Sequence, residues 1–144
     1  MKNVTELLKS KPARAVVTVR PEDTVLDAIK ILAQEDVGAA VVLSGGRLVG
    51  IFSERDYTRK VVLKGRSSES TRVEEIMTAN VVCVSPRAKT RDCMALMSEK
   101  NIRHLPVVEE DRVVGMVSIR DIVTDIIADQ EFTISQLESY ISGQ

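Results

Sequence analysis

The sequence predicts a mixed α/β (α+β) fold in which one strand–helix–strand–strand–helix unit, βαββα, occurs twice. The first observation is a repeated stretch: GRLVGIFSERD at 46–56 and DRVVGMVSIRD at 111–121 share glycine, serine, arginine and aspartate in register. The second is that 17–56 aligns with 82–121 without a gap. Because one unit of about 40 residues cannot cover its own apolar face, we expect the two copies to pack into one body.

Length and composition are those of one ordinary domain. The chain has 144 residues, of which 44% are hydrophobic, enough to bury a core without disulfides or metals. Its 20 basic and 21 acidic side chains leave a net charge of −1, so the overall field attracts neither nucleic acid nor an anionic membrane. No apolar stretch approaches the roughly 18 residues of a membrane span, and residues 1–10 lack a signal-peptide core. We therefore expect a cytoplasmic protein.

Each copy is expected to begin with a short strand and an amphipathic helix. VVTV at 16–19 and VVCV at 81–84 are β-branched runs that end just before an X-Pro pair, and proline cannot donate to a strand ladder. Thr24 and Asp27 form a capping-box pattern at the first helix, whereas Lys89 replaces Thr24 in the second copy, so that cap is expected to weaken or shift. Apolar positions at i, i+3, i+4 and i+7 predict both helices: Val25, Ala28, Ile29 and Leu32, then Thr90, Cys93, Met94 and Met97.

The two cysteines are expected to be reduced core residues. Cys83 falls on the predicted strand and Cys93 on the apolar face of the predicted helix. Neither belongs to a Cys-x-x-Cys motif or a Cys/His cluster, so the sequence gives no metal or redox site.

A hairpin and a final helix complete each copy. GAAVVL and RHLPVV precede the polar turns SGG and EED, and RLVGIF and RVVGMV follow them. The segments SERDYTRKVVLKG and SIRDIVTDIIAD predict the last helices, and Gly65 is placed to end the first of them.

The segments outside the aligned units give the domain limits. The obvious linker is GRSSEST at 65–71. The segment RVEEIMT after it predicts a short helix that leads into the second unit, and NVTELLK near the N-terminus predicts the equivalent helix for the first unit. We therefore place the first repeat with its N-terminal helix at 1–66, the second repeat at 67–130 and a C-terminal helix at 131–144. In that last segment Ile134, Leu137 and Ile141 predict an amphipathic helix that packs either on the body or on a second subunit.

Ser53-x-x-Asp56 and Ser118-x-x-Asp121 allow two interpretations. Serine followed three residues later by an acid is a helix-capping pattern. Capping alone does not require Arg55 and Arg120 beside the aspartates, at a helix start that already attracts anions. A carboxylate can accept hydrogen bonds from ribose hydroxyls, while a hydroxyl and a guanidinium can hold phosphate. The spacing leaves capping and nucleotide binding both open.

The duplicated unit with GIFSERD, GMVSIRD and RHLPVV resembles the tandem cystathionine-beta-synthase (CBS) domain pair, or Bateman module, over about residues 7–130. The resemblance implies two repeats packed sheet to sheet about a pseudo-twofold axis, with two clefts that hold adenine nucleotides. In that family the aspartate takes the ribose hydroxyls and the Ser/Thr before it reaches the phosphate. These roles fall on Asp121 and Ser118 in one cleft and on Asp56 and Ser53 in the other.

The resemblance also implies that the two clefts differ. At the entry to the second strand, where such proteins often carry basic residues, the second copy has Arg103 and His104 but the first has Gly38 and Ala39. With Arg120, this gives the cleft of Asp121 the fuller phosphate-binding set, and we rank it first. Val17, Val37 and the approach at 11–15 would form its wall. The cleft of Asp56 would have Arg55, with Arg59 and Lys60 one turn further, and a wall of Thr78, Val82 and Ile102.

His104, the only histidine, is expected to contact phosphate or to be buried and hydrogen-bonded, since no second histidine or carboxylate cluster supports a metal. The sequence also shows no phosphate loop, nucleophile elbow or acid/base pair, so we do not expect an enzyme or a required cofactor.

The resemblance implies a stand-alone regulatory sensor whose ligand is an adenine nucleotide: AMP as the leading candidate, otherwise ADP, ATP or NAD(H). We expect a homodimer that acts on a regulated protein the sequence does not identify. The alternative is a ligand-free CBS scaffold for protein–protein interaction, in which the arginines and aspartates pair with one another. Nucleic-acid binding is disfavoured by the near-neutral charge and by only two Tyr and two Phe for base stacking.

Overall fold

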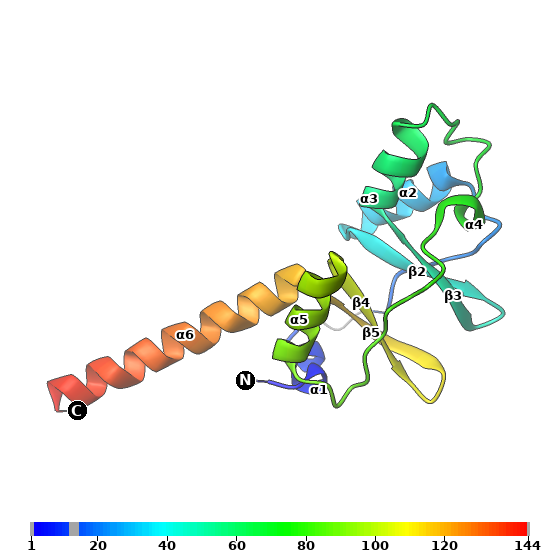
Figure 1. Cartoon of the computed structure of the whole chain (residues 1–144). Helices are drawn as coiled ribbons and strands as arrows, with labels where there is room; N and C mark the ends of the chain where they lie inside the picture. The colour runs from blue at the N-terminus through cyan, green and yellow to red at the C-terminus, as the bar shows by residue number, and fades with distance from the viewer. Residues whose placement is uncertain (1, 12–14, 144) are drawn as a thin grey trace.

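The computed structural model describes residues 2–11 and 15–143 and confirms a mixed helix and strand fold built from two similar halves (Figure 1). The first half contains α2 (Val25–Glu35), β2 (Ala39–Ser44), β3 (Arg47–Ser53), α3 (Glu54–Tyr57) and a turn of π-helix, η1 (Thr58–Val62), after the short strand β1 (Thr18–Val19). The second half contains α5 (Thr90–Lys100), β4 (His104–Glu109), β5 (Arg112–Ser118) and α6 (Ile119–Ser142). Two short helices, α1 (Val4–Lys9) and α4 (Val73–Ile76), precede the halves.

Each half has an antiparallel hairpin, and the two hairpins contact each other through β3 and β5. In the first half β1 pairs in parallel with β2, which gives a three-stranded sheet in the order β1-β2-β3. Each half also has its own cluster of buried apolar residues, centred on Phe52 and Leu32 in the first and on Leu105 and Ile122 in the second.

The predicted strand at 81–84 is wrong: among the described residues only Val84 bridges to Val107, and the strand at 16–19 shortens to Thr18–Val19. Pro106 gives the physical reason. In the first copy the N–H of Val41 donates to the carbonyl of Val17. Pro106 stands at the matching position and has no N–H, so the ladder loses that bond.

The prediction for the cysteines is confirmed at one site and wrong at the other. Both are free thiols, and Cys93 is fully buried in the core of the second half. Cys83, in contrast, is exposed. Val84 is buried in that core and Val82 packs against it, whereas Cys83 between them points to the other side, as the exposed Thr18 does at the matching position of β1. Burial still raises the pKa of both thiols.

The predicted domain limits group α1 with the first half and α4 with the second half. In the structure each of these short helices packs against the other half. Val4 and Leu7 of α1 are buried in the core of the second half, and Val73 and Ile76 of α4 in that of the first. Glycines allow this close approach. A Cβ on Gly115 would lie 2.7 Å from Cδ1 of Leu8, and one on Gly50 would lie 2.5 Å from Sδ of Met77. The limits at 1–66 and 67–130 stay predictions, and each of the two cores contains residues from both sides of the limit between them.

The helix ends agree in part with the sequence. Thr24 Oγ accepts a hydrogen bond from the N–H of Asp27, as predicted, and Lys89 supplies no side-chain cap to α5. Gly65 follows η1 with a positive φ of 67°. The C-terminal segment is helical but is not a separate helix, because α6 continues without a break from Ile119 to Ser142 and projects beyond the body (Figure 1). No helix in the described part of the chain is both long and apolar enough to cross a membrane.

Candidate functional site

Both Ser-x-x-Asp motifs form capping boxes at the start of a helix. The N–H of Ser118 donates to Oδ2 of Asp121 at 2.9 Å, and the N–H of Asp121 donates to Oγ of Ser118 at 3.2 Å. Ser53 and Asp56 repeat this arrangement at 3.1 Å for both bonds. The capping interpretation is therefore confirmed, but it uses only one oxygen of each carboxylate.

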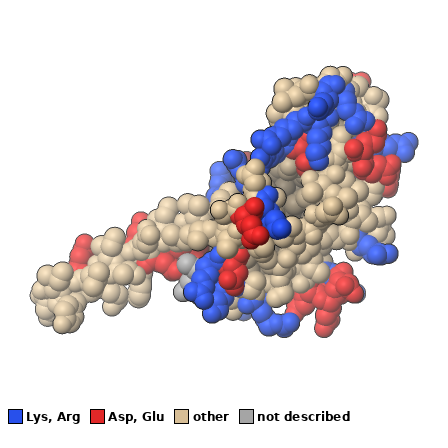
Figure 2. Space-filling view, in the orientation of Figure 1, with Lys and Arg blue, Asp and Glu red and all other residues tan. Residues whose placement is uncertain are grey.

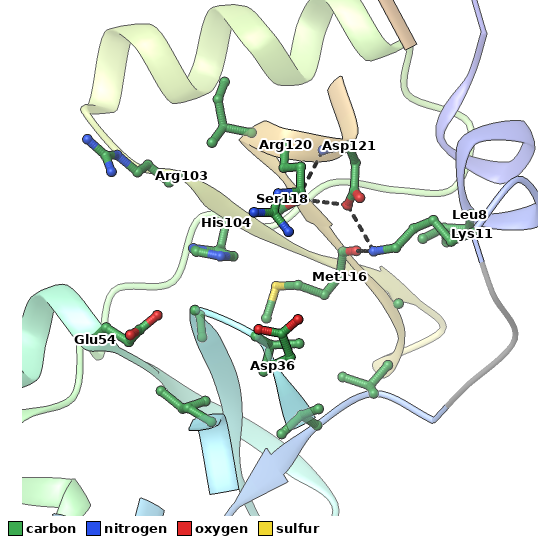
Figure 3. Close-up of a pocket in the computed structure, with 18 of the residues that line it drawn as sticks. Leu8, Lys11, Asp36, Glu54, Arg103, His104, Met116, Ser118, Arg120 and Asp121 are labelled. Carbon is green, nitrogen blue, oxygen red and sulfur yellow. Dashed lines mark hydrogen bonds and ion pairs between the residues drawn. The ribbon is translucent and has the colours of Figure 1, made fainter. Parts of the chain in front are cut away.

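The remaining carboxylate oxygens differ between the copies. Oδ1 of Asp56 is 3.1 Å from Nζ of Lys60 and accepts a hydrogen bond from Oγ of Thr78 at 3.3 Å. In the second copy Lys11 donates to Oδ2 of Asp121 at 2.8 Å and to the carbonyl of Met116 at 2.9 Å (Figure 3). No other described residue donates a hydrogen bond to the carboxylate of Asp121, so its Oδ1 can still accept hydrogen bonds from a ligand.

A cavity of about 540 Å³ lies at Asp121, between the two halves (Figure 3). It brings together the residues that the sequence assigned to this cleft, which are Asp121, Ser118, Arg120, Arg103, His104, Val17 and Val37. Of the approach at 11–15 only Lys11 and Ala15 are described, and both line the cavity. Two charged lining residues were missed: Asp36 and Glu54. Their contribution depends on how the halves dock, which the local pattern does not encode.

A second cavity of about 780 Å³ lies at Asp56. It is lined by the expected Asp56, Ser53, Arg55, Thr78 and Ile102, but Val82 is not among its lining residues. Arg59 and Lys60 line it as well, and so does Lys100 at the end of α5, which the sequence analysis did not single out. Arg55 also spans the halves, since its guanidinium donates to the carbonyl of Asn101 at 2.9 Å.

The described lining residues give the two cavities different charge balances. Around Asp121 the described part of the chain places three cations, Lys11, Arg103 and Arg120, and three carboxylates, Asp36, Glu54 and Asp121. Around Asp56 five cations face two carboxylates: Arg55, Arg59, Lys60, Lys100 and Arg103 against Glu54 and Asp56. Figure 2 shows a band of Lys and Arg on the part of the surface where Figure 1 places α3. On charge alone, the cavity of Asp56 is the more attractive to phosphate.

A single layer of residues forms a wall of both cavities: Gly38, Glu54, Arg103 and His104. His104 is packed so closely that a Cβ on Gly38 would lie 3.2 Å from its Cε1. Burial lowers the pKa of His104, the nearby Asp121 carboxylate opposes that shift, and Lys11 and Arg103 add to it. Within the described ranges, no three His, Cys, Asp or Glu side chains are grouped so as to hold a metal ion.

Comparison with known proteins identifies the family of the duplicated unit. The family model described as "CBS domain" matches residues 4–63 and again 73–128. A CBS domain-containing mitochondrial protein of Arabidopsis thaliana, CBSX3, is 39% identical over 97% of this chain and 72% of its own length. YhcV, a CBS domain-containing protein of Bacillus subtilis, is 31% identical over 82% of this chain and 84% of its own length.

Solved structures agree with these matches. A protein with CBS domains from Burkholderia ambifaria superposes with a TM-score of 0.86 at 50% identity, over 90% of this chain and 96% of that one. A CBS domain protein of Pyrobaculum aerophilum, solved as a complex with AMP, has a TM-score of 0.73 at 27% identity over 83% and 89%. The CBS domain pair of protein MJ0100, solved with 5′-methylthioadenosine and S-adenosyl-L-methionine, has a TM-score of 0.77 at 25% identity over 90% and 98%.

Proposed function

The chain belongs to the CBS domain family, and on that premise we propose that it is a regulatory module that binds an adenine nucleotide between its two repeats. The observation that carries the proposal is the Asp121 cavity, in which a carboxylate lies among Arg120, Arg103 and His104 and has one oxygen that accepts no hydrogen bond from the described residues. The AMP, methylthioadenosine and S-adenosylmethionine in the similar structures belong to those proteins, and they support an adenosine-containing ligand here.

The proposed binding mode assigns one part of the nucleotide to each group of residues. Oδ1 of Asp121 accepts hydrogen bonds from the ribose hydroxyls while Oδ2 stays in the capping box. Arg120 and Ser118, beside the first turn of α6, take the phosphate. Val17 and Val37 of the first repeat cover the adenine. AMP is the leading ligand for this cavity, because its nearly balanced charges suit a ligand with few phosphates.

The Asp56 cavity is proposed as a second nucleotide site that favours more phosphates. Five lining cations suit ADP, ATP or NAD(H) better than AMP, because each added phosphate brings charge that Lys and Arg can neutralise. Both oxygens of Asp56 are already engaged inside the protein, so the ribose would have to displace Lys60 or Thr78.

We propose that binding is signalled by a change in conformation or in a homodimer and is read by a regulated protein, without catalysis. Asp121 is in the first turn of α6, and Lys11 joins it to the segment after α1. A ligand that binds the Asp121 carboxylate weakens its ion pair with Lys11. Such a ligand shifts the equilibrium between two conformations only if it binds one of them more tightly than the other. The proposed compartment is the cytoplasm.

One observation favours the scaffold alternative for the first repeat. Asp56 is about nine-tenths buried and its carboxylate is satisfied by Ser53, Lys60 and Thr78. Internal pairing of this kind was expected of a module that binds no ligand.

Isothermal titration with adenosine, AMP, ADP, ATP and NAD tests the proposal, with Asp121→Asn and Asp56→Asn as a matched pair. Asparagine keeps a cap acceptor but removes the charged ribose acceptor. We expect Asp121→Asn to weaken AMP roughly tenfold to a hundredfold, because hydrogen bonds to charged groups contribute about 1.5–3 kcal/mol. If no ligand binds the wild type, the scaffold function stands instead. If AMP binds the wild type and Asp121→Asn equally tightly, the assignment of Asp121 as the ribose acceptor is wrong.

A further inference from the structure

The strongest unexplained feature of the molecule is the apolar outer surface of α6. Most of the large hydrophobic side chains that are exposed in the described part of the chain lie on this one helix, although it is only 24 residues long. They are Ile119, Val123, Ile127, Phe132, Ile134, Leu137, Tyr140 and Ile141. A soluble domain rarely leaves so many apolar side chains together without a partner.

Five of these side chains follow a seven-residue repeat. Ile127, Ile134 and Ile141 are spaced by sevens, and Val123 and Leu137 lie four residues before Ile127 and Ile141. In the coiled-coil notation the isoleucines occupy a positions, and Val123, Gln130 and Leu137 occupy d positions. A β-branched residue at a with leucine at d favours two parallel strands, and the three isoleucines and Leu137 fit this pattern.

The a and d positions face away from the body along the whole helix. In the first half of α6, Ile122 and Asp125 are buried against the protein and Ile126 is half-buried, whereas Val123 and Ile127 on the other side are about half exposed. Beyond them the helix projects from the fold (Figure 1), where Ile134 is 55%, Leu137 56% and Ile141 83% exposed. An unsupported helix of this length is only marginally stable in water, so a second element must cover it.

The charges select the partner and its direction. After Arg120 the chain contains no Lys or Arg, and Figure 2 shows only acidic and uncharged residues on the projecting part. Glu131 and Glu138 occupy e positions. In a parallel pair these positions face the g positions Ile126, Thr133 and Tyr140, which are uncharged, whereas an antiparallel pair brings the glutamates of both copies together.

We propose that the partner of this surface is a second copy of the chain, and that two α6 helices form a parallel two-stranded coiled coil over about three heptads from Val123 to Ile141. Because Ser118 and Asp121 begin the same helix, the coil would connect the two Asp121 cavities of a dimer. The inference specifies the homodimer of the proposed function but needs no nucleotide.

Sedimentation equilibrium of the full chain without nucleotide tests it. We expect the wild type to have the mass of two chains, and Ile134→Glu with Leu137→Glu to dissociate the pair by at least about a hundredfold, since an unpaired charge buried between the helices is costly. Phe132→Glu with Ser135→Glu, on the outward f and b positions, is the matched control and should stay dimeric. All four side chains are exposed, so both variants should retain the fold by circular dichroism.

A cysteine cross-link tests the direction. Ile141→Cys in a Cys83→Ser background should form covalent dimers under mild oxidation, because only parallel helices in register bring the two thiols within bonding distance. A monomeric wild type, a double-glutamate variant that remains dimeric, a control that dissociates, or a dimer that does not cross-link would each overturn the proposal. Since nucleotide affinity is measured separately by titration, failure of the coiled coil and failure of the proposed function give different results.

Discussion

Asp56 and Asp121 occupy matching positions in the two copies, but one substitution a turn further along the helix changes their surroundings. Lys60 forms an ion pair with Asp56, whereas the residue at the matching position in α6 is Asp125. Asp125 is buried and has an ion pair with Lys2 at 3.4 Å. The cation for Asp121 comes instead from Lys11, far away in the sequence. The exchange of lysine for aspartate at this position is therefore one cause of the difference between the two carboxylates.

His104 should make the stability of the protein depend on pH. Burial lowers its pKa below the ordinary value of 6.5, so the folded state binds a proton less readily than the unfolded state does. The contribution of neutral His104 is fully present above pH 6.5 and is lost as the pH falls from there through the lowered pKa of the folded state. The free energy of unfolding, measured by urea at pH 7.5 and 5.5, should fall less in His104→Gln than in the wild type.

Other charged groups lie near His104, so the experiment must separate their titration from that of the histidine. Asp121, Lys11 and Arg103 act on its charge, and Glu54 lies at the same wall. Glutamine keeps a polar side chain of similar size there without titrating. Equal pH dependence in the wild type and His104→Gln would show that the proton is bound by other groups.

At the scale of the elements, the copies differ wherever a backbone or cap hydrogen bond is missing. Pro106 removes one donor and with it the strand that precedes the second helix. Lys89 leaves α5 without the side-chain cap that Thr24 gives to α2, although both residues have the same extended backbone. The second copy therefore keeps the helix and the hairpin, but its hairpin lacks the third strand and its helix α5 lacks a side-chain cap.

Restoring the cap should stabilise the second copy. Lys89→Thr gives the first N–H groups of α5 a side-chain acceptor, and we expect the free energy of unfolding to rise by about 0.5–1 kcal/mol. The reciprocal Thr24→Lys should lower it by about 1 kcal/mol. Urea denaturation of both variants measures these changes. A Lys89→Thr protein no more stable than the wild type would mean that α5 is already capped adequately by other groups.

At the scale of the whole molecule, the two cavities share the wall that contains Arg103 and His104. Residues from both halves line each cavity, so neither half forms a cavity by itself. We expect a phosphate-bearing ligand in one cavity to change the charge that Arg103 presents to the other. The docking of the halves, in which β3 contacts β5, therefore shapes both cavities at once.

Arg103 should affect both cavities, and two other arginines only one each. Arg103→Ala is expected to weaken phosphate-bearing ligands roughly tenfold at both sites, while adenosine is little affected. Arg120→Ala should act only at the Asp121 cavity and Arg59→Ala only at the Asp56 cavity. Titrations in Asp56→Asn and Asp121→Asn backgrounds separate the sites. Loss of affinity at only one cavity in Arg103→Ala would show that its side chain serves that cavity alone.

The sequence by itself determined the repeat, the helix and hairpin of each copy, and the Ser-x-x-Asp pattern that the structure shows as two capping boxes. These follow from local features: the period of the apolar residues, the turn residues and the spacing from Ser118 to Asp121. Of the described side chains that it named for the two clefts, all but Val82 line the two cavities. Local pattern is sufficient there because each of these side chains is placed by the strand or helix of the repeated unit to which it belongs.

Only the tertiary structure decided which contacts cross between the copies. The exchange of α1 and α4 between the two cores, the ion pair of Lys11 with Asp121 and the placement of Lys100 depend on how the halves dock. So do the different charge balances of the cavities and the unbroken projection of α6. Such long-range contacts are set by the summed packing of both halves, and no spacing within either copy encodes them.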